Sequence, residues 1–181
     1  MLYQAWKERL GGGQQLADIQ KYVLVHMNVV RPVGPFNAGH PNIQYFFHQL
    51  PLIFAKARAD GDLFWHAHGA RAPDGQYLEM DGILAQDTRG TQDNLHIITM
   101  AGWRDIKAMH RFTYREPLHV EGMRTLRDWV DRSDGATMVM WWVVRGTRVS
   151  LAEGWERLQS LRQNGASKDA FSLQQRFAAP E

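Results

Sequence analysis

Four stretches of the chain have the composition of β-strands, and the longer stretches between and after them have helical spacing of apolar residues. The strands are rich in β-branched and aromatic residues and are expected at residues 21–30, 63–71, 95–103 and 137–146. The helices repeat apolar positions every three or four residues and are expected at 42–59, 104–131 and 151–162. Polar segments rich in glycine and proline separate these elements.

The order of the elements predicts an α+β fold. Strand, helix, strand, strand, helix, strand is the ferredoxin-like βαββαβ pattern, and a further helix follows at the C-terminus. Pro51 predicts a kink or a break in the first helix, and Pro117 an interruption in the second. The chain is expected to form an N-terminal arm over residues 1–20, in which a triple glycine at residues 11–13 ends a short helix, and one domain over residues 21–181.

The last strand predicts how the sheet is covered. Its sequence, MVMWWVV, is apolar on both faces, so both faces should be buried. A ferredoxin-like unit covers one face of its antiparallel sheet with helices. We therefore expect a homodimer in which two sheets pack face to face, a dimeric α/β barrel.

Composition narrows the class of protein. The chain has 181 residues, 44% of them hydrophobic, and a formal charge of +2 without a run of basic residues, which argues against nucleic-acid binding. It contains no cysteine, so a metal site would have to use His, Asp or Glu. The N-terminus lacks the pattern of a signal peptide, and no apolar stretch is long enough to span a membrane. A cytoplasmic location is the expectation.

Histidines on the strands are the first candidates for chemistry. His66 and His68 are two residues apart, so their side chains should share one face of the sheet, and His26 with Asn28 on the first strand should approach the same cavity. His66 and His68 could bind a metal if a third ligand joined them. The three histidines could also act as catalytic bases or bind substrate, or they could be structural. These alternatives stay open.

The second half of the chain resembles a bacterial family known only as a domain of unknown function. The resemblance begins at Met100 and rests on a tryptophan after the third strand, a Phe-x-Tyr-Arg stretch followed by a histidine, spaced arginines before a tryptophan, the Trp141-Trp142 pair and a closing Ala-Phe. It implies a dimeric α/β barrel. Where that family usually has Gly-His-x-Pro-Thr, this chain has Gly-Thr-Arg-Val-Ser at residues 146–150.

The same stretch is similar, more loosely, to spheroidene monooxygenase. The shared pattern is Phe112, Tyr114, Arg115, Pro117 and His119. Related barrels include haem enzymes and cofactor-free antibiotic-biosynthesis monooxygenases. The resemblance implies that His119 could be an axial haem ligand, with Arg115 pairing with a haem propionate or a substrate carboxylate. The alternative is a structural His119, bonded to a backbone group, with Tyr114 in the core.

The predicted function is an enzyme that acts on a small hydrophobic metabolite, most simply a monooxygenase-type oxidoreductase. Haem bound through His119 is one mechanism. The other has no cofactor and uses His26, His66 or His68 as a base, which would also suit a cyclase, isomerase or lyase. A non-catalytic carrier of a small ligand or of haem is the remaining alternative. Besides these histidines and Arg115, the candidates for contact with substrate are Asn28, Trp65, Tyr114 and Trp142.

Overall fold

A computed structural model describes residues 20–34, 36–37, 39–79 and 94–181. The predicted N-terminal arm lies outside the described residues except for Gln20. Part of the loop after the second predicted strand, residues 80–93, lies outside them as well. The helices and strands are β1 (Tyr22–Pro32), α2 (Pro41–Ala59), β2 (Leu63–Arg71), β3 (Tyr77–Glu79), β4 (His96–Trp103), α4 (Ile106–Arg115), α5 (Pro117–Thr125), the short 3-10 helix η1 (Arg127–Trp129), β5 (Val130–Asp131), β6 (Met138–Val144) and α6 (Leu151–Asn164).

The strands form one antiparallel sheet with the predicted topology. The strand order is β3-β2-β4-β1, and the far edge of β1 pairs first with β6 and then, near its end, with β5. Taken without the two short strands β3 and β5, the order β2-β4-β1-β6 is that of a ferredoxin-like βαββαβ sheet. The predicted fold class is therefore confirmed.

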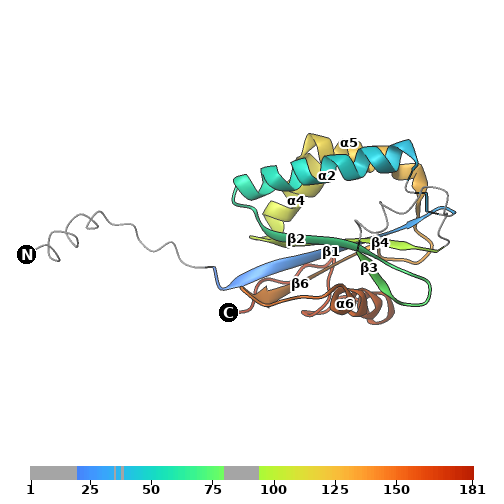
Figure 1. Ribbon diagram of the computed structural model, residues 1–181. Helices are drawn as coiled ribbons and strands as arrows, with labels where there is room; N and C mark the ends of the chain where they lie inside the picture. The colour runs from blue at the N-terminus through green and yellow to red at the C-terminus, as the bar shows by residue number, and fades with distance from the viewer. Residues whose placement is uncertain (1–19, 35, 38, 80–93) are drawn as a thin grey trace, which may run out of the picture.

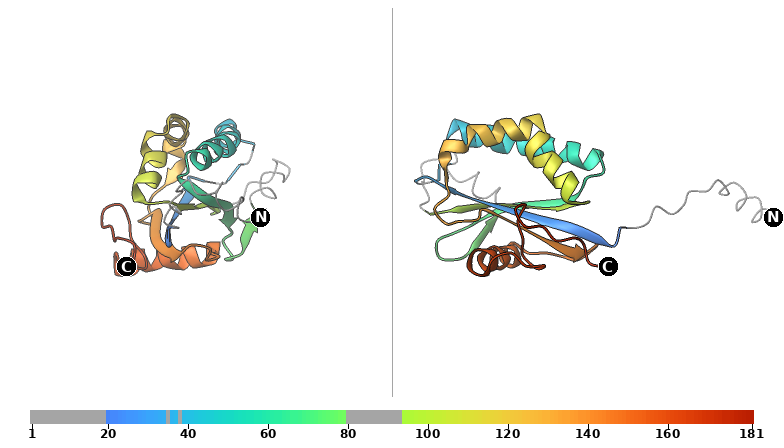
Figure 2. Two further views of the ribbon diagram at one scale, coloured as in Figure 1. Left: turned by 90° about the vertical axis from the view of Figure 1, so that its left-hand side faces the viewer. Right: turned by 180° about the vertical axis from the view of Figure 1, so that it is seen from behind.

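Helices cover both faces of this sheet. Figure 1 shows α2, α4 and α5 above it and α6 below, and Figure 2 shows the same layers from two other sides. Val25, Met27 and Trp141 pack with Leu158 of α6 in one buried cluster. The second face, which was expected to need a partner subunit, is thus covered by the chain's own C-terminal helix. The predicted dimer stays a prediction, but the uncovered face that motivated it is absent from the described part of the chain.

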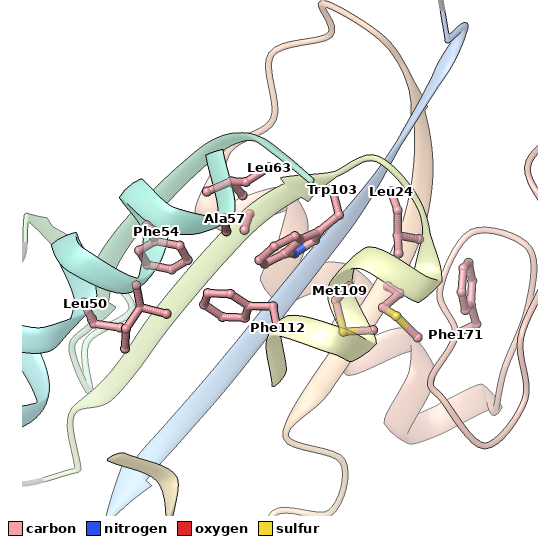
Figure 3. Close-up of a cluster of buried hydrophobic side chains, with 12 residues drawn as sticks. Leu24, Leu50, Phe54, Ala57, Leu63, Trp103, Met109, Phe112 and Phe171 are labelled. Carbon is pink, nitrogen blue, oxygen red and sulfur yellow. The ribbon is translucent and has the colours of Figure 1, made fainter. Parts of the chain in front are cut away.

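The core between the upper helices and the sheet is aromatic at one end. Phe54 of α2, Trp103 of β4 and Phe112 of α4 meet there, with Leu24 and Met109 beside them (Figure 3). The rings of Phe54 and Phe112 stack with centroids 5.3 Å apart, and Trp103 lies 4.6 Å from Phe112. Fully burying side chains of this size contributes about 1.5–3 kcal/mol each, which anchors α2 and α4 to the strands.

The predicted helices agree with the structure at Pro117 but differ from it at Pro51 and at the end of the second predicted helix. Pro51 does not break α2, because it lies on the exposed side while Leu50, Ile53 and Phe54 are buried and hold the helix across the missing hydrogen bond. Pro117 does end α4, since Glu116 before it is extended, at φ −72° and ψ 117°. The expected helix stops at Thr125 rather than residue 131, and Val130–Asp131 pairs with β1 instead.

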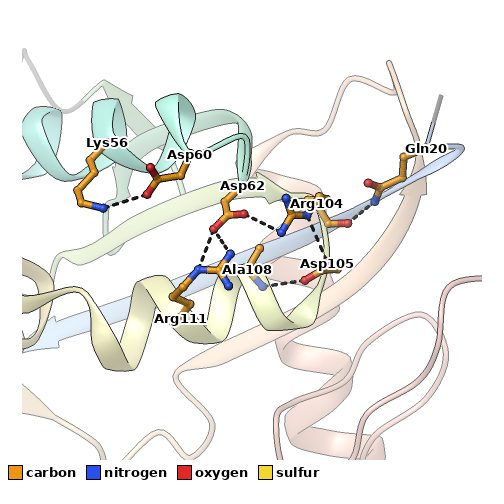
Figure 4. Close-up of polar contacts among 8 residues, drawn as sticks. All are labelled: Gln20, Lys56, Asp60, Asp62, Arg104, Asp105, Ala108 and Arg111. Atoms are coloured by element: carbon orange, nitrogen blue, oxygen red, sulfur yellow. Dashed lines mark hydrogen bonds and ion pairs between the residues drawn. The ribbon is translucent and has the colours of Figure 1, made fainter. Parts of the chain in front are cut away.

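A buried carboxylate ties the turn between α2 and β2 to α4. Asp62 is 5% exposed, accepts hydrogen bonds from Arg111 and lies 2.9 Å from Nη2 of Arg104 (Figure 4). Asp105 caps the first turn of α4 through the backbone N–H of Ala108 at 2.7 Å.

Within the described part of the chain, no helix has the length and apolar character that crossing a bilayer requires.

Candidate functional site

A cavity lies between the upper helices and the sheet. Its volume is about 520 Å³, which falls in the usual range for small-molecule sites, about 300–1,000 Å³. The sheet supplies its floor, and α2, α4 and α5 supply its walls. Most of the wall is apolar, from side chains such as Ile43, Phe46, Leu50 and Val120.

The register of β1 and β4 orders the side chains along the floor. His26 lies opposite Ala101, Asn28 opposite Thr99, and Val30 opposite Ile97, and all six residues line the cavity. Because alternate residues of a strand share a face, His26 and Asn28 point to the same side, as predicted. The polar groups thus occupy the middle of the floor, between the aromatic end at Trp103 and the other end at Val30.

His26 is held in its neutral form. Burial lowers the pKa of His26 to about 3, and the nearby His119 adds a smaller effect in the same direction. Among the described residues none forms a hydrogen bond with the His26 ring. An imidazole that borders a cavity and has no hydrogen-bond partner among the described residues is available to a ligand.

His119 reaches the cavity from the helical layer. Pro117 begins α5, which places His119 in the first turn of that helix. Its Nδ1 lies 3.0 Å from the carbonyl oxygen of Thr113, so Nδ1 carries the proton and donates it. Its ring packs 4.7 Å from Phe112. This tautomer leaves Nε2 with a lone pair and with no partner among the described residues.

Opposing influences act on the acidity of His119. Burial lowers the pKa of its imidazolium, while the Thr113 carbonyl and the Glu116 carboxylate act in the opposite direction. His119 is therefore neutral at pH 7, but its surroundings favour the protonated form more than those of His26 do. The arrangement can accept a proton at Nε2 and stabilise the resulting charge from the Nδ1 side.

Three arginines border the end of the cavity beyond Val30. Arg124, Arg127 and Arg132 line it, while no Asp or Glu appears among the described lining residues. Nothing in the sequence singled out these arginines as site residues. The only signal was their place in the family pattern, where Arg124 and Arg127 are the spaced arginines before Trp129.

His66 and His68 share a face as predicted, but they lie outside the cavity. Their rings are parallel, with centroids 6.0 Å apart, and His66 stacks on Phe54 at 4.2 Å. Nδ1 of His66 lies 3.2 Å from Nη2 of Arg58, which can only donate, so this nitrogen is engaged as an acceptor. Burial lowers the pKa of His66, and Arg58 adds to the effect.

The described residues contain no group of three His, Asp or Glu side chains that could hold a metal ion. The predicted metal site at His66 and His68 thus lacks its third ligand there. His96, whose face was left open by the sequence, lies on the α6 side, with Nε2 3.2 Å from Asp134 and its ring against Trp155.

The remaining sequence candidates are dispersed. Arg115 is exposed at the end of α4, outside the cavity and beside Lys56 and Glu116. Tyr114 is 53% exposed and lines the cavity, so its interpretation as a core residue is wrong. Trp65 packs on the α6 side of the sheet, and Nε1 of Trp142 donates to the Phe177 carbonyl at 2.9 Å. Neither tryptophan lines the cavity.

The predicted haem site is not supported by these positions. His119 has the donor arrangement of an axial ligand, one nitrogen bonded to a carbonyl and the other available. Arg115, the residue expected to pair with a propionate, does not reach the cavity that His119 lines. The position of Arg115 therefore gives no support to a haem bound by His119 in this cavity.

Comparison with known proteins gives a family and a distant structural match. A family profile described as a domain of unknown function (DUF3291) matches residues 23–181. No curated protein sequence matches the chain. The solved structure of SnoaB, described as a cofactor-independent oxygenase from Streptomyces nogalater, aligns with 72% of this chain and 97% of its own, at 14% identity and a TM-score of 0.29. At this TM-score the overlap assigns no activity here.

Proposed function

The chain belongs to the family described as a domain of unknown function (DUF3291). Since this description names no activity, we propose the function from the cavity itself. The protein is an enzyme that acts on a small, mostly apolar metabolite without a cofactor. His119 accepts a proton from the substrate, and His26 and Asn28 hold the oxygen on which negative charge develops.

The main observation behind this proposal is the hydrogen bond between Nδ1 of His119 and the Thr113 carbonyl, which fixes the tautomer of His119. Its Nδ1–H donates to the Thr113 carbonyl, so the lone pair on Nε2 belongs to a ring that lines an apolar cavity. A general base needs this arrangement: a neutral nitrogen next to the substrate and a second group that fixes its orientation.

Burial lowers the pKa of both cavity histidines, but only at His119 do a carbonyl and a carboxylate act in the opposite direction, and this difference assigns their roles. With a pKa of about 3, His26 binds a proton too weakly to act as the base at neutral pH. It remains a neutral hydrogen-bonding group in the floor. His119 has the Thr113 carbonyl and Glu116 to stabilise its imidazolium, and is therefore the better proton acceptor.

The reaction begins with removal of a proton from a carbon next to a carbonyl group. Nε2 of His119 takes the proton, and the electron pair of the broken C–H bond moves onto the carbonyl oxygen. Molecular oxygen then adds to the carbanion by electron transfer and C–O bond formation, and the resulting peroxide anion takes the proton back from His119. Loss of water leaves a new carbonyl, so R₂CH₂ and O₂ become R₂C=O and H₂O.

Return of the proton to another carbon, with no oxygen consumed, would make the same site an isomerase or cyclase. Both reactions share the first step, which can be measured separately. The test uses 2-tetralone, a bicyclic ketone with acidic C–H groups, in D₂O without oxygen. NMR follows exchange of these hydrogens for deuterium, and an oxygen electrode then follows uptake in air.

The wild-type protein is expected to accelerate exchange, and His119→Gln to lose about 10²-fold or more of that acceleration, the usual contribution of a general base. His48→Gln changes an exposed histidine of α2 outside the cavity and should match the wild type. Equal exchange in His119→Gln and the wild type would reject His119 as the base. Binding of the ketone without any exchange would indicate a ligand carrier.

A further inference from the structure

We infer that the natural ligand of the cavity is an apolar molecule with an acidic group, and that Arg124, Arg127 and Arg132 bind this group. The inference rests on the proposed function in that it concerns the same cavity, and it adds the substrate class. A carboxylate is the simplest such group, because a guanidinium binds its two oxygens with two parallel hydrogen bonds.

The charge of the residues that line the cavity favours an anionic ligand. Three arginines and two neutral histidines face the cavity, and within the described residues no carboxylate does so. Asp131, the acidic residue next to Arg132, is already bound by Arg31. Glu121 and Asp128 are exposed, and neither is among the residues that line the cavity.

Most other described arginines have a partner, and Arg115 and Arg148, which have none among the described residues, lie outside the cavity. Arg31, Arg104, Arg111 and Arg157 each pair with a carboxylate, and Arg162 donates to the carbonyl of Ala136 at 2.8 Å. Arg71 and Arg145 lie over the rings of Trp155 and Phe64. In the part of the chain that the structure describes, Arg124, Arg127 and Arg132 have no ion pair or hydrogen-bond acceptor for their side chains. Three guanidiniums that border one cavity without a counterion form a binding site for an anion.

The place of Arg124 near the end of α5, with Arg127 in η1 and Arg132 after β5, constrains the shape of the ligand. Arg124 follows His119 by five residues, about 7.5 Å along a helix that rises about 1.5 Å per residue. The apolar lining continues past His119 to the aromatic end at Phe112 and Trp103. The acidic group is therefore expected at the arginine end of the cavity, with the apolar part of the ligand extending toward Phe112 and Trp103.

All three arginines are exposed, so water and salt reach the bound anion. Their effect on affinity is accordingly moderate and falls as ionic strength rises. The dependence on ionic strength distinguishes anion binding by these arginines from a buried ion pair and gives the test a second readout.

Two fluorescent probes test the inference. 8-Anilino-1-naphthalenesulfonate carries an anionic group, and N-phenyl-1-naphthylamine has the same aromatic skeleton without it. Dissociation constants of both are measured for the wild type, for Arg124→Gln/Arg127→Gln, and for Arg148→Gln. Arg148 is an exposed arginine outside the cavity and serves as the matched control.

The expected result is about a tenfold or greater rise in the dissociation constant of the anionic probe in the double variant, with the neutral probe changed less than about twofold. Salt, raised from about 0.05 M to about 0.5 M, should weaken only the anionic probe. Arg148→Gln should match the wild type in both assays.

Equal effects of the double variant on the two probes, or none on the anionic one, would overturn the inference and leave the proposed function intact. If the wild type binds neither probe, the cavity is not a ligand site, and the proposed function fails with the inference.

Discussion

His26 and His119 face one cavity from opposite layers of the molecule, and their surroundings give them different acidities. His26 is a strand residue with no hydrogen-bond partner among the described residues, and burial dominates its pKa. His119 is a helix residue with a carbonyl behind its ring. A lone pair next to substrate and a fixed ring orientation are features of His119, whereas His26 offers a neutral hydrogen bond.

The depressed pKa of His26 predicts a loss of stability in acid. The folded pKa is about 3 and the ordinary value is 6.5, so between these pH values the unfolded chain binds a proton that the folded chain does not. The free energy of unfolding should therefore fall as the pH drops below 6.5. His26 alone contributes up to about 1.4 kcal/mol per pH unit, or about 2 kcal/mol between about pH 6.5 and about pH 5.

Urea unfolding of the wild type and His26→Gln at several pH values measures this contribution. The variant should lose less stability in acid than the wild type. His66, His96 and His119 also have lowered pKa values and should leave a residual dependence of the same sign. Parallel curves for the two proteins would show that His26 is not the buried neutral group described above.

The sequence predicts His26 and His119 as site residues but not the arginines Arg124 and Arg127. His26 and Asn28 follow from the two-residue period of a strand, which holds wherever the strand is correctly placed. Arg124 and Arg127 fall within the helix expected at residues 104–131, and only the packing of α5 and η1 over the sheet shows that they border a cavity. Arg115 was assigned to the site by similarity alone, and the turn at Pro117 directs it elsewhere.

At the scale of elements, α4 depends on a single buried carboxylate. Asp62 binds Arg104 and Arg111 at the junction of α2, β2 and α4, and its own exposure is 5% (Figure 4). The backbone of Asp62 adds to the junction, because its carbonyl accepts from the N–H of Arg104 at 2.8 Å. The end of α4 nearest the sheet is thereby held, and with it the start of the wall that carries Phe112.

Replacing Asp62 should destabilise this junction. Asp62→Ala removes the acceptor of Arg111 and one of the two carboxylate partners of Arg104, and is expected to cost about 1–3 kcal/mol of unfolding free energy, the lower part of that range because both arginines are partly exposed. Asp60→Ala is the matched control, since its ion pair with Lys56 is exposed and should matter by less than about 0.5 kcal/mol. Urea unfolding measures both. Equal, small effects would mean that Asp62 does not hold α4.

The elements themselves follow from the sequence where local pattern and packing agree. The four long strands were predicted correctly because the runs of β-branched residues that indicate a strand locally are also the runs that pair in the sheet. Pro51 was misleading, since burial of neighbouring side chains outweighs one missing hydrogen bond. Val130–Asp131 was misleading for the opposite reason: its helical spacing is local, whereas its pairing with Arg31 and Pro32 is made over about a hundred residues of chain.

At the scale of the whole molecule, the sheet separates two environments. The upper face carries the cavity and its histidines, and the lower face is closed by α6, where Gly154 lets the helix approach Met27 and Trp141. The apolar character of β6 predicted burial on both faces, but no local pattern distinguishes a chain's own helix from a second subunit. The tail beyond α6 returns to the edge of β6, where Phe171 pairs with Met140 and joins the core of the upper face.

The central claim is that the cavity over His26 and beneath His119 is the functional site, with both histidines neutral. Two-bond ¹H–¹⁵N NMR of the eight histidines tests it directly, with His26→Gln and His119→Gln for assignment. At pH 7 we expect an uncharged His26, the Nδ1–H tautomer for His119, and shifts of both on addition of 8-anilino-1-naphthalenesulfonate, with His66 and His68 unmoved. A protonated His119, its Nε2–H tautomer, or shifts confined to His66 and His68 would contradict it.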